Sequence, residues 1–301
     1  MELVKKIKKL QKERHAVILA HNYQVPEVQD IADFVGDSLG LSVQASKTDA
    51  DVIVFCGVHF MAETAKILSP EKRVLLPDKD SACPMADMIN ADQLRKLKAA
   101  HPGAKVLCYV NTSAEVKAEC DMCCTSSNAV KIVREAFAKD EEIIFVPDKY
   151  LAHYVASQAG RDFITWKGFC PTHARILPEA IVEQKRLHPQ AKVIVHPENR
   201  PEVIALADAV LSTGGMSTFA HKDSAEEFIV GTEIGILHRL QKENPGKKFY
   251  RVSDVAVCPN MKRTTLEKVL WSLEEMTFEI EVPEETAARA RDSIKKMLAY
   301  S

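Results

Sequence analysis

The dipeptide Cys-Pro occurs three times in this chain, where chance predicts fewer than one occurrence among 301 residues with 8 cysteines and 14 prolines. Its three cysteines, Cys83, Cys170 and Cys258, are spaced by 87 and 88 residues. Other segments repeat with the same period: HPGAKVLCYV resembles HPQAKVIVHP, and PEVQDIAD resembles AEVKAECD and PEVIALAD. A fixed internal period of this kind predicts an architecture built from repeated structural units.

The repeat divides the chain into three units with the same order of apolar and helical segments. Each unit opens with an apolar strand (AVILA, KVLCYV or KVIVH), and three further apolar runs follow with helical segments between them. Apolar strands that alternate with helices predict a parallel sheet covered by helices on both faces. We therefore expect an α/β protein with three α/β/α sandwich domains, related by a pseudo-threefold axis around a central site. The predicted ranges are 15–102, 103–189 and 190–278, with flanking helices at 1–14 and 279–301.

Composition and charge exclude several classes of protein. The formal net charge is −2 and no long run of like charges occurs, which argues against binding to nucleic acid or to a membrane surface. No stretch of 18 apolar residues is present, and the N-terminal MELVKKIKKLQKER is a charged amphipathic helix rather than a signal peptide. Eight cysteines without a secretion signal are typical of the reducing cytoplasm, where cysteines are more often metal ligands or core residues than disulfides. We therefore expect a cytoplasmic protein without a nucleic-acid or membrane partner.

Polar residues recur with the period at the ends of the predicted strands, and ligands of open parallel sheets bind beyond those ends. The set comprises the strand-end residues His21, Tyr109 and His196, the residues two positions later, Tyr23, Asn111 and Glu198, and the later hydroxyls Ser38, Ser126 and Thr213. If the three domains pack with their strand ends inward, equivalent residues surround one cavity. The alternative is a purely structural role, in which the histidines are core residues and the hydroxyls are helix caps.

The periodic cysteines predict a metal centre at the same cavity. A structural zinc site takes four protein ligands, whereas three thiolates suit a [4Fe–4S] cluster with one iron free of a protein ligand. That open iron would act as a Lewis acid toward a carboxylate, hydroxyl or nitrogen of a substrate. The alternative is that the Cys-Pro pairs survive only as a trace of gene triplication.

The remaining periodic residues indicate the kind of substrate. The three hydroxyls precede helical or glycine-rich stretches, where a hydroxyl and free backbone N–H groups bind anions. Three such places around one cavity suit a substrate with several carboxylates or a phosphate. Tyr23 and Glu198 are natural proton-transfer groups, and the two histidines can donate hydrogen bonds or protons.

Two features depart from the period near the predicted cavity. His173, in CPTH, has Ala86 and Met261 at the equivalent places, so it marks either substrate-specific chemistry or a structural role. Glu233, in the segment GTEIG at a strand end, either faces the cavity or is structural.

The other five cysteines have no periodic counterparts. Cys120 and Cys123 form a CxxC that Cys124 follows, which indicates either a regulatory disulfide or metal role, or a packed second strand. Cys56 and Cys108 lie inside apolar strands and are expected to be inert core residues.

Nine segments together resemble the quinolinate synthase family over essentially the whole length, in order and in all three units. They are AHNYQVPEVQDIADFVGDS, CPMA, YVNTSAEVKAECD, TSSNAV, CPTH, VIVHPE, STGGM, GTEIG and CPNMK. The resemblance implies three α/β/α domains around a pseudo-threefold axis, with a [4Fe–4S] cluster at the centre. It also implies the condensation of iminoaspartate with dihydroxyacetone phosphate to quinolinate, with loss of phosphate and water, on the route to NAD.

The resemblance also implies roles for individual residues. Cys83, Cys170 and Cys258 match the cluster ligands, and Tyr23 and Glu198 match the acid–base residues. The substrate-binding positions are matched by His21, His196, Tyr109, Asn111, Ser38, Ser126, Thr213 and His173. The implied functional partner is an aspartate oxidase or dehydrogenase that supplies iminoaspartate.

Two other functions compete with this one. The first is a different iron–sulfur hydro-lyase with the same open iron and another polycarboxylate, which product analysis distinguishes. The second is a non-catalytic scaffold held by zinc, in which His173 would be the fourth ligand because it is the only candidate nearby in sequence.

Overall fold

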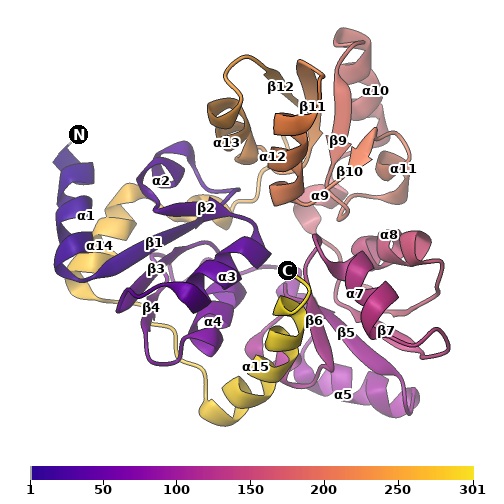
Figure 1. The fold of residues 1–301 in the computed structure, drawn as a ribbon, viewed down its shortest axis with the longest axis horizontal. Coiled ribbons are helices and arrows are strands. Elements are labelled where there is room, and N and C mark those ends of the chain that lie inside the picture. Colours follow the sequence, from indigo (N-terminus) through magenta and orange to yellow (C-terminus); the bar gives the residue numbers. More distant parts are fainter. Residues whose placement is uncertain (1) are drawn as a thin grey trace.

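The computed structural model describes residues 2–301 and shows three lobes arranged around a common centre (Figure 1). The first lobe contains β1 (Ala16–His21), β2 (Phe34–Gly36), β3 (Val52–Cys56) and β4 (Arg73–Leu75). The second contains β5 (Lys105–Tyr109), β6 (Met122–Cys124), β7 (Ile143–Val146) and β8 (Ile164–Thr165). The third contains β9 (Lys192–Val195), β10 (Ala209–Val210), β11 (Glu227–Gly231) and β12 (Lys248–Arg251).

Helices separate these strands. Before β5 they are α1 (Glu2–Glu13), α2 (Pro26–Ile31), α3 (Ser38–Lys47), α4 (His59–Leu68), the 3₁₀ turn η1 (Ala86–Met88) and α5 (Ala91–Ala100). Between β5 and β9 they are α6 (Ala114–Ala118), α7 (Ala129–Ala136), α8 (Lys149–Ala159), α9 (Pro171–Ala174) and α10 (Pro178–Leu187). After β9 they are α11 (Pro201–Ile204), α12 (Thr213–Lys222), α13 (Ile236–Glu243), the 3₁₀ turn η2 (Met261–Arg263), α14 (Leu266–Glu275) and α15 (Glu284–Leu298).

The three sheets have one topology. Their strand orders are β2-β1-β3-β4, β6-β5-β7-β8 and β10-β9-β11-β12, and every pairing within them is parallel. Buried strands of parallel sheets are apolar on both faces, and the first sheet illustrates this. Ile18 and Ala20 of β1 pack with Ile7 of α1, whereas Leu19 between them packs with Leu41 of α3 on the other face. The predicted α/β class with three repeated sandwich units is confirmed.

The aspartates shared by the three repeats have a structural role. Asp33, Asp121 and Asp208 each accept a hydrogen bond, at 2.7–2.8 Å, from a backbone N–H of the first strand fifteen residues earlier. The backbone N–H of each aspartate donates back to the carbonyl of that same strand residue. The repeated aspartate therefore fixes the second strand of each unit beside the first.

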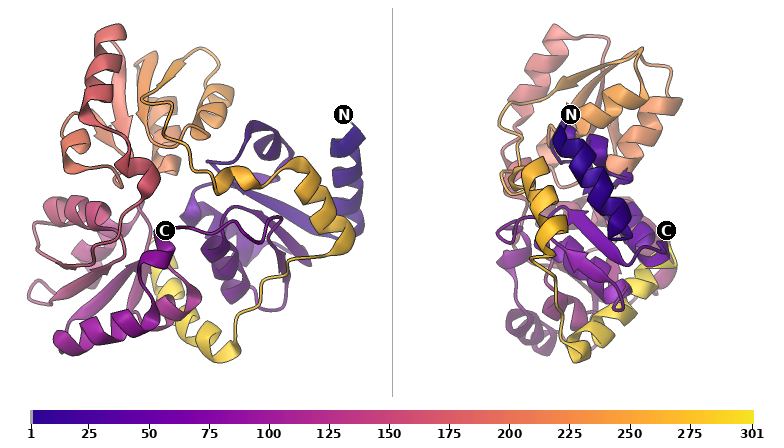
Figure 2. Two further views of the ribbon diagram at one scale, coloured as in Figure 1. Left: turned by 180° about the vertical axis from the view of Figure 1, so that it is seen from behind. Right: turned by 90° about the vertical axis from the view of Figure 1, so that its left-hand side faces the viewer.

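The two C-terminal helices return to earlier units, as the two views of Figure 2 show. Helix α14 lies beside α1 and contacts β3, although its residues fall within the range 190–278 predicted for the third unit. Helix α15 packs on α6 and β6 of the second unit and on α4 of the first. The end of the chain thus ties the first and second units together.

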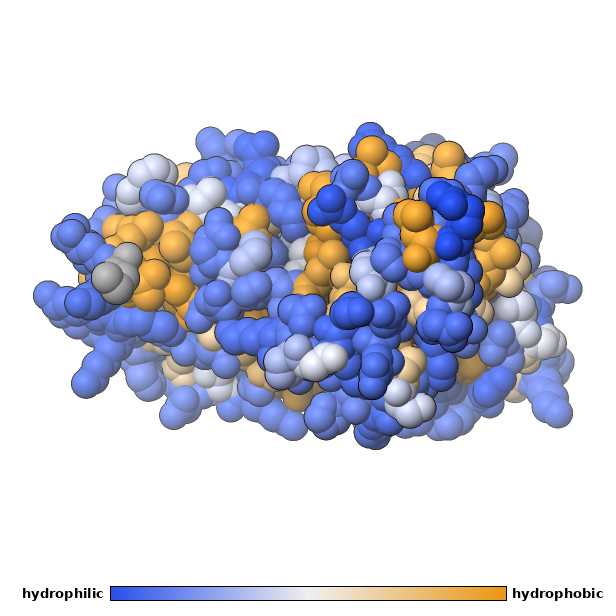
Figure 3. Space-filling model, turned by 90° about the horizontal axis from the view of Figure 1, so that it is seen from above, coloured by the Kyte–Doolittle hydropathy of each residue, from blue (hydrophilic) through white to orange (hydrophobic). Residues whose placement is uncertain are grey.

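One face of the molecule is predominantly hydrophilic. Figure 3 shows blue, polar residues over most of one face, with smaller apolar patches between them. Within residues 2–301, none of the helices combines the length and the apolarity that a membrane crossing requires.

Candidate active site

A cavity lies among the three sheets, and loops that follow the carboxyl ends of their strands line it. All residues predicted for the site line this one space: His21, Tyr23, Ser38, Cys83, Tyr109, Asn111, Ser126, Cys170, His173, His196, Glu198, Thr213 and Cys258. They come from all three units, and parallel strands present their carboxyl ends at one edge of a sheet. The structure therefore brings the whole predicted set together.

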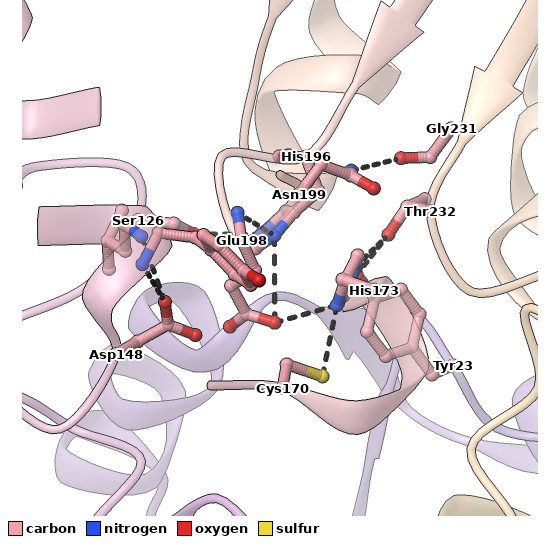
Figure 4. Close-up of polar contacts among 12 residues, drawn as sticks. Tyr23, Ser126, Asp148, Cys170, His173, His196, Glu198, Asn199, Gly231 and Thr232 are labelled. Atoms are coloured by element: carbon pink, nitrogen blue, oxygen red, sulfur yellow. Dashed lines mark hydrogen bonds and ion pairs between the residues drawn. The ribbon is translucent and has the colours of Figure 1, made fainter. Parts of the chain in front are cut away.

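Glu198 is the centre of a buried hydrogen-bonded network (Figure 4). The Tyr109 hydroxyl donates to its Oε1 at 2.5 Å, and His173 Nδ1 lies 2.8 Å from its Oε2. Burial favours the neutral carboxyl, but the imidazole of His173 and the hydroxyl of Tyr109 outweigh burial and hold the pKa of Glu198 well below its usual range. Glu198 is therefore a carboxylate at neutral pH.

Tyr23 reaches the same network from the first unit. Its hydroxyl lies 2.5 Å from Thr232 Oγ1 and 3.5 Å from His173 Nε2. Burial and the negative charge of Glu198 raise the pKa values of Tyr23 and Tyr109 well above that of free tyrosine. Both phenols are therefore protonated at neutral pH and available as donors.

His21 and His196 occupy equivalent places and have the same orientation. The backbone N–H of Tyr23 donates to His21 Nδ1 at 3.2 Å, and that of Glu198 donates to His196 Nδ1 at 3.3 Å. Burial, reinforced for His21 by His196 and for His196 by His173, lowers the pKa of each histidine to about 3. Each ring is therefore neutral with its proton on Nε2, and Nε2 of His196 lies 3.2 Å from Ser126 Oγ. These are polar groups of the cavity rather than inert core residues.

The predicted hydroxyls lie at the helix starts but do not cap the helices. Ser38 and Thr213 are the first residues of α3 and α12, and the caps are the preceding Asp37 and Ser212, whose side chains accept from backbone N–H groups. Ser126 precedes α7 by three residues. The Thr213 hydroxyl accepts from Asn22 Nδ2 at 2.8 Å, and Ser126 contacts His196, so these hydroxyls belong to the polar lining of the cavity. Asn111 Oδ1 in the same cavity is buried without a hydrogen-bond partner among the described residues.

Each Cys-Pro pair begins a short helical turn at the cavity. Cys170 is the N-cap of α9 and Pro171 its first residue, while η1 and η2 follow Cys83 and Cys258. Burial raises the pKa of all three thiols, to about 12 for Cys83, whereas nearby backbone N–H groups two or three residues later favour each thiolate. Proline at the start of such a turn suits its fixed φ and missing N–H.

This set of donors fits a thiolate-bound metal centre. Three half-buried thiols near backbone N–H groups become stable as thiolates when a cation neutralises them. Three thiolates can bind three of the four irons of a [4Fe–4S] cluster and leave the fourth without a protein ligand. Cys170, His173 and Glu198 also place one ligand atom each within 4.8 Å of one another, a geometry that can hold a metal ion. His173 Nδ1 lies 3.1 Å from Cys170 Sγ.

The other cysteines lie outside the cavity and are free thiols in this structure. Cys56 and Cys108 are buried in β3 and β5, as expected of core residues. Cys123 and Cys124 lie in β6, and Cys123 is the residue opposite Cys108 in the neighbouring strand β5. Cys120 Sγ donates to the carbonyl of Val116 at 2.9 Å. Strand packing accounts for Cys123 and Cys124, as the structural alternative expected.

Three further residues belong to this site but were not predicted from the sequence: Thr232, Asp148 and Lys262. Thr232 links Tyr23 to His173, with its Oγ1 2.8 Å from His173 Nε2. Asp148 and Glu233 follow β7 and β11 and lie beside the backbone N–H groups of Cys170 and Cys258. Lys262 pairs with Glu233. The signal available for Asp148 and Glu233 was their matching place two residues after the third strand of their units, although Val58 holds that place in the first unit.

Known proteins resemble this chain over nearly its whole length. The family model described as quinolinate synthetase A protein matches residues 5–299. A quinolinate synthase of Dehalococcoides mccartyi strain CBDB1 is 59% identical over 97% of this chain and 96% of its own length. Quinolinate synthases of Methanosarcina barkeri and Geotalea uraniireducens are 56% and 55% identical over 99% of this chain and 97% of theirs. The chain therefore belongs to the quinolinate synthetase A family.

Proposed function

We propose that the protein is a quinolinate synthase that condenses iminoaspartate with dihydroxyacetone phosphate to quinolinate, releasing phosphate and water. The observation that carries the proposal is the shared cavity, in which three periodic cysteines lie with the proton-transfer pair Tyr23 and Glu198. The named relatives support the same reaction. The reaction belongs to NAD biosynthesis in the cytoplasm, and an aspartate oxidase or dehydrogenase would supply the iminoaspartate.

The cofactor of the proposal is a [4Fe–4S] cluster held by Cys83, Cys170 and Cys258. When bound, the cluster supplies one iron without a protein ligand as a Lewis acid for a carboxylate or nitrogen of the substrate. The backbone N–H groups near each sulfur favour the thiolate form that such a cluster requires.

Proton transfer falls to the network around Glu198. Isomerisation of a triose phosphate and dehydration of the condensed product both require a proton to move between neighbouring carbon and oxygen atoms. The Glu198 carboxylate is charged and accepts a proton from carbon, while the neutral Tyr23 phenol donates to oxygen. His173 touches both residues and Thr232, so it holds the acid and the base in fixed positions.

The remaining residues suit an anionic substrate. The Nε2–H groups of His21 and His196 are neutral donors, and the hydroxyls of Ser38 and Thr213 stand at the N-termini of ten-residue helices. Helix N-termini and hydroxyls bind carboxylate and phosphate through their N–H and O–H groups. The enclosure of the cavity by three units limits water, which protects an imine from hydrolysis.

The first test is anaerobic purification with iron, sulfide and visible-absorption analysis, followed by an assay of quinolinate formation. The proposal expects a brown protein with about four irons per chain and quinolinate as product. Cys170→Ser is expected to lose both the absorption and the activity, whereas Cys124→Ser, a buried thiol outside the cavity, is expected to keep them. A wild-type protein that remains colourless after reconstitution with iron and sulfide would contradict the cluster and the reaction.

A single metal ion is the second candidate, because Cys170, His173 and Glu198 have suitable ligand atoms close together. It predicts a colourless protein with one zinc per chain that His173→Ala releases. Metal analysis of the same preparation separates it from the cluster.

A further inference from the structure

Glu233 lies at the cavity wall, yet protein groups occupy both of its carboxylate oxygens. Its side chain lies two residues after β11 and is fully buried. Oε1 accepts from the backbone N–H of Cys258 at 3.2 Å, and Oε2 accepts from the backbone N–H of Gly235 at 2.7 Å. A carboxylate with these partners holds its neighbours in place.

Lys262 completes the arrangement from the turn that follows Cys258. Its Nζ lies 2.9 Å from Glu233 Oε1 and 3.1 Å from Oε2, and it also donates to the backbone carbonyl of Tyr23. A buried carboxylate without a cation would be strongly unfavourable, so the two charges depend on each other. The pair therefore joins β11 of the third unit, the Cys258 turn and the Tyr23 loop of the first unit.

Gly235 shows how closely this junction is packed. A Cβ at this position would lie 2.7 Å from Lys262 Nζ, 2.7 Å from the Tyr23 carbonyl oxygen and 2.8 Å from Glu233 Oε2. Only glycine leaves room for the ion pair here. The segment GTEIG therefore supplies Thr232 to the Tyr23 hydroxyl, Glu233 to Cys258, and the space in which Lys262 reaches both.

We propose that Glu233 and Lys262 are a pair of positioning residues that fixes one cysteine and the acid–base tyrosine relative to each other. The two side chains carry opposite charges next to Cys258. The Glu233 carboxylate would lower the electron affinity of a cluster bound there, and the Lys262 ammonium would raise it. This inference rests on the proposed function for its consequences in catalysis, but its structural part concerns only the chain itself.

The test compares Glu233→Gln, Lys262→Met, Gly235→Ala and the double variant E233Q/K262M with the wild type. Glu63→Gln is the matched control, because Glu63 is a buried glutamate that accepts a backbone N–H from Ala114 at 3.1 Å and does not line the cavity. Gly235→Ala displaces the pair without changing either charge, so it separates position from charge.

The first readout is amide hydrogen exchange of the segment 256–263, measured by mass spectrometry on the full chain. We expect exchange of this segment to become about tenfold faster in E233Q, K262M and G235A, since hydrogen bonds to charged partners are lost. The E63Q control is expected to leave this segment unchanged. Equal exchange in the wild type and all three variants, or the same acceleration in E63Q, would overturn the proposal.

The second readout is the reduction potential of the iron–sulfur absorption, with kcat and KM measured alongside. Loss of the carboxylate in E233Q is expected to make the potential more positive, loss of the ammonium in K262M to make it more negative, and the double variant to lie near the wild type. We expect kcat to fall about 10- to 100-fold in K262M with KM little changed, because Tyr23 shifts. Shifts of one sign in both single variants would indicate general disruption and overturn the positioning role. If the wild-type protein binds no cluster, the proposed function is contradicted but the positioning role of Glu233 and Lys262 is not. Hydrogen exchange still tests that role, because it does not require a cluster.

Discussion

Glu198→Gln is the most informative single change in the acid–base network. The substitution keeps the size of the side chain and an oxygen that can accept from Tyr109, which lies 2.5 Å from Oε1. It removes the negative charge and the basic oxygen that faces His173 Nδ1 at 2.8 Å. The fold and the proposed cluster should therefore survive while the base is lost.

The expected size of the effect follows from these contacts. Loss of a positioned general base costs about 10²- to 10⁴-fold in kcat. Tyr109→Phe keeps the base but removes one hydrogen bond to a charged acceptor, worth about 1.5–3 kcal/mol, so we expect a loss of about 10- to 100-fold. The order of activities should be wild type, then Y109F, then E198Q.

The assay is the initial rate of quinolinate formation under anaerobic conditions, with iron content and visible absorption measured on each sample. Equal cluster content across the three proteins is the internal control. If E198Q kept its cluster and stayed within about fivefold of the wild-type kcat, Glu198 would not be the base and the proposed proton transfer would be wrong.

Other predictions concern the histidines, a repeated aspartate and the CxxC cysteines. Because burial lowers the folded-state pKa of His21 and His196 to about 3, the unfolded chain binds more protons below pH 6.5, and stability is lost as the pH falls from 6.5 toward 3. Each histidine should lower the free energy of unfolding by about 2 kcal/mol at pH 5. His196→Gln should therefore reduce the difference in Tm between pH 7 and pH 5. An unchanged difference would contradict a neutral buried ring. Asp121→Ala should lower the free energy of unfolding by about 1–3 kcal/mol in a denaturant titration, because the Val106 N–H loses its partner, with kcat of the folded protein unchanged. Cys123→Ser should keep the wild-type iron content, and a loss of iron would show that the CxxC takes part in metal binding.

The sequence by itself determined the repeated architecture and predicted residues that line one cavity in the structure. Apolar runs at a constant period require the same short strands in each unit, and a parallel sheet places the residues after those strands at one edge. The period therefore selected Cys83, Cys170 and Cys258 and their polar neighbours without knowledge of any contact. It could also place the shared aspartates, but not show that they bind the first strand of their own unit.

Only the tertiary structure decided which of these groups touch. Glu198 meets Tyr109 from the second unit, Tyr23 meets Thr232 from the third, and Lys262 meets Glu233 and the Tyr23 carbonyl. These partners are 29 to 239 residues apart, so no local pattern encodes the pairing. Period and strand pattern record local backbone preferences, whereas the protonation and role of a buried side chain depend on the charges and donors that folding brings within a few ångströms.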